Sequence, residues 1–94
     1  MDFPARPPGG PEQSAGLRAL AESIAGEAGL IWKIWTESAE GKRAGGIYLF
    51  ANEAAARAYH TMHEARLAAQ GIGPVRAEYR GVNAGLTALT RGPV

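Results

Sequence analysis

The sequence predicts an α+β fold in which helices pack against an antiparallel β-sheet. Two segments rich in β-branched and aromatic residues, 30–37 and 45–50, are separated by a short polar loop, which is the arrangement of an antiparallel hairpin. Segments with helical signals lie on both sides of this hairpin, at 11–24 and 53–69. The 94 residues include no cysteine, and we expect them to form one domain, residues 1–94.

The first strand of this fold is expected to be very short. Only residues 1–3 precede Pro4, so they are either a stub or the end of a strand that begins upstream of the sequence. Residues 4–11 are rich in proline and glycine and are expected to form a turn, with Pro11 at the first position of a helix. The apolar stripe of that helix consists of Leu17, Leu20, Ala21 and Ile24. The helix is expected to end at Gly26 or Gly29.

Both faces of the hairpin carry large apolar side chains. In its first strand Ile31 and Trp35 lie on one face and Trp32 and Ile34 on the other, because successive side chains of a strand point in opposite directions. An antiparallel sheet normally leaves one face to water. Two helices can cover one face, but a chain of this length has nothing left to cover the other. We therefore predict an obligate homodimer in which a second copy of the sheet covers it.

The remaining elements complete a ferredoxin-like βαββαβ order. Asn52 is a good N-cap for the second helix, which Gly71 is expected to end. Residues 75–80 alternate apolar and charged side chains, which predicts a strand with one exposed face. Asn83 is expected to cap a last short helix or turn through Leu86 and Leu89. Strands and helices in this order give an antiparallel sheet with both helices on one side.

Charge and composition exclude several classes of function. The net charge is +1, from ten basic and nine acidic side chains that are mixed along the chain, so no basic surface for nucleic acid or an anionic membrane is expected. No apolar run is long enough for a signal peptide or a membrane span. The expectation is a soluble cytoplasmic protein with no nucleic-acid or membrane partner.

Several runs of residues carry a family resemblance. They are 21–24, 29–38, 44–50, 58–59 and 63–67, and the most specific among them read Trp-Lys-Ile-Trp-Thr-Glu and Gly-Gly-Ile-Tyr-Leu-Phe. These runs resemble the YdhR-like monooxygenase family, and Asp2–Pro4 resembles the end of that family's first strand. The resemblance implies a dimeric α+β barrel, related in fold to the antibiotic-biosynthesis monooxygenases.

The resemblance also implies a reaction, the oxidation of a small phenolic or quinone-type aromatic with O2 and no bound cofactor. Such chemistry needs an apolar pocket, a base or hydrogen-bond donor for the substrate anion, and exclusion of water. We expect His63 and Tyr48 to be catalytic, since His63 should face the sheet from the second helix. Substrate contacts are expected from Trp35, Trp32, Lys33 and Arg66, although each of these also suits an ordinary core, interface or ion-pair role.

Other functions stay open beside this one. A dimer of the same fold could hold a small aromatic ligand without transforming it, and the same superfamily includes haem-degrading oxygenases that pair a tryptophan with a helical histidine. RNA recognition is disfavoured, because Gly45 and Ile47 occupy positions where RNA-recognition modules place stacking aromatics. A metal site is not expected, because His60, His63 and Glu64 lack the i, i+4 histidine pair of helical zinc motifs.

Overall fold

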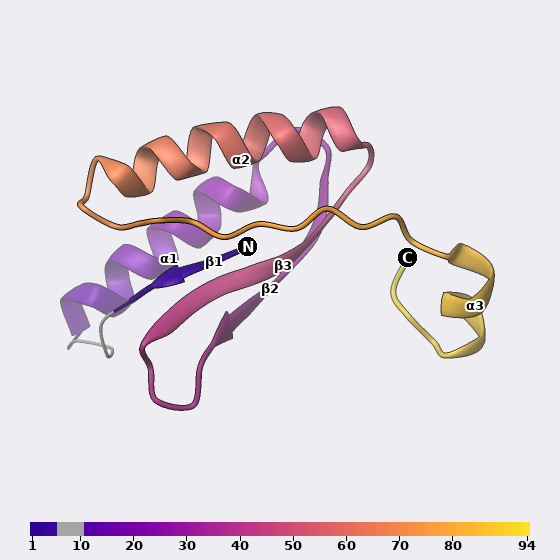
Figure 1. The fold of residues 1–94 in the computed structure, drawn as a ribbon, viewed down its shortest axis with the longest axis horizontal. Coiled ribbons are helices and arrows are strands. Elements are labelled where there is room, and N and C mark those ends of the chain that lie inside the picture. Colours follow the sequence, from indigo (N-terminus) through magenta and orange to yellow (C-terminus); the bar gives the residue numbers. More distant parts are fainter. Residues whose placement is uncertain (6–10) are drawn as a thin grey trace.

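The computed structural model of the protein describes residues 1–5 and 11–94, with only the backbone described for 11–14. The predicted α+β class is confirmed, with helices and a three-stranded antiparallel sheet (Figure 1). The predicted turn over residues 4–11 lies largely outside the described residues. In chain order the elements are β1 (Asp2–Pro4), α1 (Pro11–Ala25), β2 (Leu30–Glu37), β3 (Arg43–Phe50), α2 (Glu53–Ala68) and α3 (Ala84–Leu89).

The sheet has the strand order β1-β3-β2, which places β3 in the centre. β2 and β3 form the predicted hairpin, in which Lys33 lies opposite Tyr48 and Ile34 opposite Ile47. β1 pairs with the other edge of β3, and Asp2 lies opposite Gly45. This is the order of a ferredoxin-like sheet, in which the strand after the first helix and the strand before the second helix are neighbours.

The strand predicted over residues 75–80 is not formed as a regular strand. Its position is marked by one isolated antiparallel bridge between Asp2 and Arg76, on the free side of β1, where a fourth strand of this fold belongs. The ladder stops on one side because Pro4 and Pro74 have no N–H to donate. On the other side β1 begins at Asp2, and the described residues form no further bridge beyond Arg76.

Ion pairs hold this narrow junction together. The Asp2 carboxylate accepts hydrogen bonds from Arg43 on β3 and from Arg76 Nη2 at 3.0 Å. The bonds from Arg43 are the first cause of a lowered pKa for Asp2, with smaller contributions from Arg76. The short first strand is therefore fixed on both sides by side chains as well as by its backbone.

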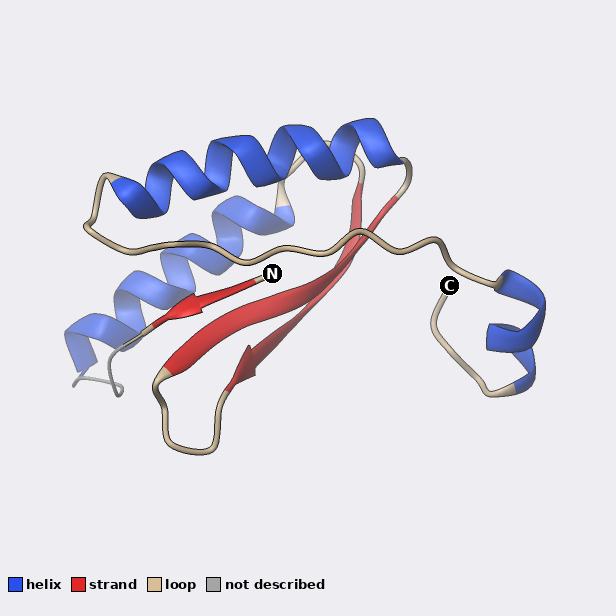
Figure 2. Cartoon of the chain, viewed as in Figure 1, coloured by secondary structure: helices blue, strands red, loops and turns tan. Residues whose placement is uncertain are grey.

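Helices α1 and α2 lie on the same side of the sheet, as Figure 2 shows. The predicted cap of α2 is confirmed, since Asn52 Oδ1 accepts from the Ala55 N–H at 2.8 Å. Ile24 of α1 and the α2 side chains Tyr59, His63 and Leu67 are buried, with at most 5% exposed. Since these α2 residues are four apart, they form one helical stripe that faces the sheet.

The opposite face of the sheet is apolar and open. Ile34 and Ile47, which are paired across β2 and β3, are 51% and 56% exposed. The predicted last helix is confirmed as α3, capped by Asn83, but it buries no residue and extends away from the sheet and its helices (Figure 1). The homodimer remains a prediction. None of the helices described is long and apolar enough to cross a membrane.

Candidate functional site

Five side chains with polar or aromatic groups gather between the sheet and α2. We call them the polar-aromatic cluster: Lys33 from β2, Tyr48 from β3, and Tyr59, His63 and Arg66 from α2. The strand residues share a face because Lys33 and Tyr48 are directly opposite each other in the ladder. The helix residues share a face because they are three or four positions apart. Four members were predicted as site residues from the sequence.

Gly46 provides the space in which Lys33 lies. A Cβ atom at position 46 would lie 2.6 Å from Lys33 Cε and 3.1 Å from Tyr48 Cε1. Lys33 Nζ then lies 3.5 Å from the centre of the Trp35 ring and 4.7 Å from the centre of the Tyr48 ring. These are cation–π distances. A glycine inside a strand often marks such a close approach.

The two tyrosines join the strand to the helix. Tyr59 Oη donates to Tyr48 Oη at 3.3 Å, and the two ring centres are 5.1 Å apart. Burial raises the pKa of the Tyr48 hydroxyl far above its usual value and also raises the pKa of Tyr59. Both hydroxyls therefore keep their protons at neutral pH. Since one hydrogen joins the two hydroxyls, the pair has one further hydrogen to donate to another oxygen.

His63 is held in its neutral form. It is 2% exposed, and its ring stacks on Tyr59 with centres 5.1 Å apart. Arg66 Nη2 lies 2.9 Å from His63 Nδ1, and a guanidinium can only donate, so the histidine proton is on Nε2. Burial, with the charges of Arg66 and Lys33, lowers the pKa of His63 to about 4. At neutral pH this side chain is a hydrogen-bond donor through Nε2, and its acceptor nitrogen is already used.

Lys33 is the group in the cluster that titrates nearest to neutral pH. Burial is the main cause, and the charge of Arg66 a second, of a Lys33 pKa lowered to about 8. No carboxylate of the described residues forms an ion pair with Lys33 or Arg66. Arg66 Nη1 also lies 3.4 Å from Ser23 Oγ on α1, at the outer side of the cluster. The cluster therefore has two cationic side chains without a counter-charge.

The structure brings together most of the residues predicted as a site. Trp35 lies beside Lys33 and is 45% exposed, so it stands at the solvent side of the cluster. Trp32 lies on the opposite face of the sheet, where its Nε1 donates to Pro93 O at 2.7 Å. Tyr59 and Gly46 were not predicted as site residues. Tyr59 precedes His63 by one helical turn, and this spacing is a signal that could have identified it.

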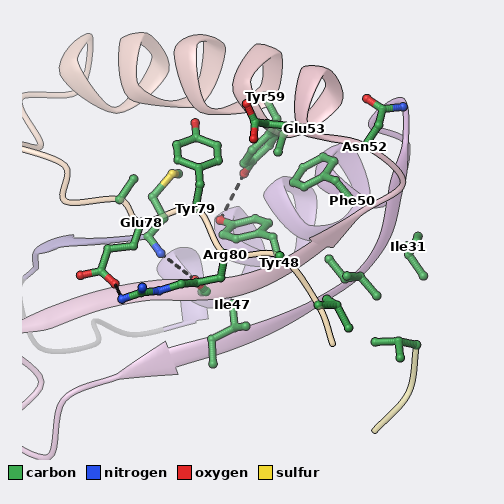
Figure 3. A pocket seen from close by; sticks show the side chains of 18 of the residues that line it. Ile31, Ile47, Tyr48, Phe50, Asn52, Glu53, Tyr59, Glu78, Tyr79 and Arg80 are labelled. Carbon is green, nitrogen blue, oxygen red and sulfur yellow. Dashed lines mark hydrogen bonds and ion pairs between the residues drawn. The ribbon is translucent and has the colours of Figure 1, made fainter. Parts of the chain in front are cut away.

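A large cavity lies next to the cluster rather than inside it. Its volume is about 800 Å³, and Figure 3 shows Tyr48, Phe50 and Tyr59 facing it across from Tyr79 and Arg80. Gly46, Tyr48 and Tyr59 line both the cavity and the cluster, whereas Lys33, His63 and Arg66 do not line the cavity. Lys33, His63 and Arg66 therefore lie beside the cavity and not on its wall.

The described residues offer no ready-made metal centre. No three His, Asp or Glu side chains among them are grouped closely enough to hold an ion. The second histidine of α2, His60, lies apart from the cluster, with its Nδ1 at 2.6 Å from Tyr79 Oη. The side chains that surround Lys33 are hydrogen-bond donors and aromatic rings, which are suited to an organic anion.

Comparison with known proteins gives the family. A search of curated proteins found no match to this chain. A family model described as "Putative mono-oxygenase ydhR" matches residues 1–93, which span every strand and helix described above. That range includes the whole polar-aromatic cluster and the hairpin that positions it. The chain therefore belongs to the ydhR mono-oxygenase family.

Proposed function

We propose that this protein is a cofactor-independent monooxygenase that oxidises a small phenolic or quinone-type aromatic with O2 at the polar-aromatic cluster. The family supports a monooxygenase in general terms. The observation that carries the finer proposal is the cluster itself, where Lys33 and Arg66 lie beside aromatic rings without a carboxylate partner. Such a site favours an aromatic substrate in its anionic form.

Lys33 is the proposed base. With a pKa of about 8, a substantial fraction of its amine is neutral near pH 8 and can take a proton from an acidic carbon or phenol of the substrate. This assigns to Lys33 the role expected of His63, whose Nδ1 is occupied and whose pKa is too low. The ammonium formed on Lys33, with the Arg66 guanidinium and the Tyr48 hydroxyl, then stabilises the substrate anion.

An anthrone-type substrate shows how the step balances. Loss of a CH2 proton to Lys33 gives a carbanion that supplies electrons to O2, and a carbon–oxygen bond forms. The O–O bond of the resulting peroxide then breaks as the second hydrogen leaves the same carbon. The carbon becomes a carbonyl with one oxygen atom of O2, and the other oxygen leaves as water. The substrate supplies all four electrons, so the step needs no other reductant.

We further propose that the protein works as a homodimer. The exposed pair Ile34 and Ile47, with Trp32 and Leu49 beside them, forms an apolar face on the side of the sheet that α1 and α2 leave open. A second sheet packed on this face would remove that apolar area from water. It would also place the two clusters on the outer sides of the paired sheets, each covered by its own helices.

The test is oxygen uptake by metal-stripped protein supplied with anthrone. We expect catalysed uptake that rises with pH through about 8 and yields the quinone and water. Lys33→Met should lower the rate by about 100-fold or more, the size of a general base contribution. Lys42→Met is the matched control, because Lys42 is exposed on the β2–β3 loop. Uptake no faster than the uncatalysed rate would contradict the oxygenase and favour a ligand-binding dimer.

A further inference from the structure

Two cations of the polar-aromatic cluster, Lys33 and Arg66, lie near the same buried ring without a negative charge between them. Both charges contribute to the lowered pKa of His63, and Arg66 also lowers the pKa of Lys33. None of the ion pairs among the described residues includes Lys33 or Arg66. The charge of Glu27 acts on Tyr59 of the cluster, but it is not among the charges that act on Lys33. An anion formed at Lys33 would therefore remove an excess of positive charge.

The Lys33 amine is the nucleophilic group of the cluster. Its Nζ lies 3.5 Å from the centre of the Trp35 ring and 4.7 Å from the centre of the Tyr48 ring, so the two rings replace part of its hydration. With a pKa of about 8, about half of this amine is neutral at pH 8, against less than about 1% of a lysine with the ordinary pKa. The neutral amine is the form of lysine that attacks an electrophilic carbon.

The surroundings of this amine leave it room on one side. Gly46 leaves the space on the sheet side to Lys33, because a Cβ atom at position 46 would lie 2.6 Å from Lys33 Cε. On the other side the amine is next to Trp35, which is 45% exposed, and Lys33 itself is half-buried. A small electrophile can therefore approach the nitrogen from the solvent side of the cluster.

Two classes of electrophile add reversibly to a neutral amine without a further reactant. An aldehyde or ketone gives an imine, which is neutral or cationic and supplies no negative charge. Carbon dioxide gives a carbamate, which is an anion with two acceptor oxygens. The groups around Lys33 are hydrogen-bond donors: the Arg66 guanidinium and the hydroxyl pair of Tyr48 and Tyr59. These donors favour the carbamate over the imine.

We infer that Lys33 is a carbamylation site that takes up CO2 reversibly, with Arg66 as the counter-charge of the carbamate. The ammonium first loses a proton to solvent, and the neutral nitrogen then attacks the carbon of CO2. A nitrogen–carbon bond forms, one carbon–oxygen π bond opens onto its oxygen, and the nitrogen releases a second proton. No electrons are transferred, so the step needs no oxidant or reductant. The charge at Lys33 changes from positive to negative, and a cation–cation pair becomes an ion pair.

The modification has a consequence for catalysis that rests on the proposed function, in which Lys33 is the base. The lone pair of a carbamate nitrogen is delocalised into the carboxylate group, so this nitrogen no longer accepts a proton from the substrate. CO2 would therefore act as a reversible inhibitor of the oxygenase. The formation of the carbamate itself does not depend on that function.

The test uses the full-length protein equilibrated at pH 8 with sodium bicarbonate, and with sodium chloride at the same ionic strength as the reference. Triethyloxonium converts a carbamate into a stable ethyl carbamate, which peptide mass spectrometry then locates. The chain has two lysines, so the exposed Lys42 is the internal control. We expect the trapped fraction at Lys33 to exceed that at Lys42 by about tenfold or more. Equal fractions, or no product at Lys33, would overturn the proposal.

The variant Arg66→Gln tests the counter-charge. Loss of the guanidinium should lower the trapped fraction at Lys33 by about tenfold. Because the same change affects the pKa of Lys33, each fraction is divided by the rate at which Lys33 reacts with acetic anhydride, which follows the neutral amine and gives an uncharged product. Arg18→Gln is the matched control, since Arg18 is 85% exposed on α1. A normalised fraction that is the same in Arg66→Gln and the wild type would overturn the pairing.

Oxygen uptake with anthrone, measured in the same two buffers, distinguishes this proposal from the proposed function. Carbamate at Lys33 together with slower uptake in bicarbonate supports both. Carbamate at Lys33 with unchanged uptake supports the modification and contradicts Lys33 as the base. Uptake that requires Lys33, with no carbamate trapped there, overturns the modification and leaves the oxygenase standing.

Discussion

Two basic side chains in the cluster have lowered pKa values for the same physical reason. Lys33 and His63 lie between a sheet and a helix, beside the permanent charge of Arg66, and no described carboxylate compensates them. Taking a cation out of water without a partner disfavours its charged form. The pKa values of both groups are lowered, so His63 is uncharged at neutral pH and Lys33 titrates near pH 8.

The variant Lys33→Met tests whether burial of the Lys33 charge lowers the stability of the folded protein. The lowered pKa means that the folded state binds the Lys33 proton more weakly than the unfolded chain does. Below pH 8 both states carry the proton, and the folded protein bears the full free-energy cost of burying the Lys33 charge. From pH 8 to 10.5 the folded state loses the proton before the unfolded chain does, so the stability of the folded state rises. Since Lys33 is only half-buried, solvent screening reduces the cost to about 1–2 kcal/mol.

Urea denaturation at pH 7 and at pH 9.5 measures the effect. At pH 7, Lys33→Met should be more stable than the wild type by about 1–2 kcal/mol, in addition to any pH-independent gain from the packing of methionine. The difference in stability between the two proteins should shrink at pH 9.5. The exposed Lys42 gives the control, since Lys42→Met should change neither value. A Lys33→Met difference that is the same at both pH values would show that packing, and not the desolvated charge, is responsible.

The residue types in the site were easier to predict than their roles. Alternation along the strand and helical spacing place Lys33, Trp35, Tyr48 and His63 near one another, and they do lie together. The role of His63 depends on Arg66 donating to its Nδ1, which is a matter of side-chain conformation that no spacing reveals. Both Trp32 and Trp35 were predicted as substrate contacts although they lie on opposite faces of β2, because both faces are apolar and the sequence does not say which one the helices cover.

Helices α2 and α3 are both capped by an asparagine, but they contribute differently to the core. Asn52 accepts from Ala55 N–H at 2.8 Å and Asn83 accepts from Leu86 N–H at 3.1 Å. α2 buries three residues, including His63, whereas α3 buries none. Loss of a cap reduces the stability of the helix in each case, but only α2 transmits that loss to the core.

The prediction is that Asn52→Ala lowers the free energy of unfolding by about 1 kcal/mol. Asn83→Ala, the matched change, should lower it by less than about 0.5 kcal/mol. Chemical denaturation compares the two global values, and hydrogen exchange should show faster exchange confined to α3 in Asn83→Ala. Similar global losses in both variants would mean that α3 is docked on something that stabilises the whole fold, which in this molecule points to a partner.

Helices and strands differ in how far the sequence predicts them. Caps and apolar periodicity are local, so α1, α2 and α3 begin and end close to their predicted limits. A strand also needs a neighbour. Residues 75–80 have the alternation of a strand, but β1 gives them one residue to pair with, so a single bridge at Arg76 forms. Whether residues 75–80 form a regular strand therefore depends on their partner strand β1 and not on their own sequence.

At the scale of the whole molecule, one face of the sheet still lacks a cover. The helices fill the side that holds the polar-aromatic cluster, and the other side presents Ile34 and Ile47 to solvent at 51% and 56% exposure. Burial of one such side chain is worth about 1.5–3 kcal/mol. Two identical faces packed together would bury the half-exposed Ile34 and Ile47 of each subunit, so the apolar face contributes favourably to dimer formation.

Ile47→Glu tests the dimer directly. The substitution places a charge at the centre of the apolar face without touching the helix side, so the subunits should separate while each keeps its secondary structure. Light scattering after gel filtration should give a dimer for the wild type at micromolar concentration and a monomer for Ile47→Glu. Leu17→Glu is the control, because Leu17 is 46% exposed on α1 and lies outside this face. A well-folded wild-type monomer at micromolar concentration would contradict the dimer and would leave Ile34 and Ile47 as an apolar surface for some other partner.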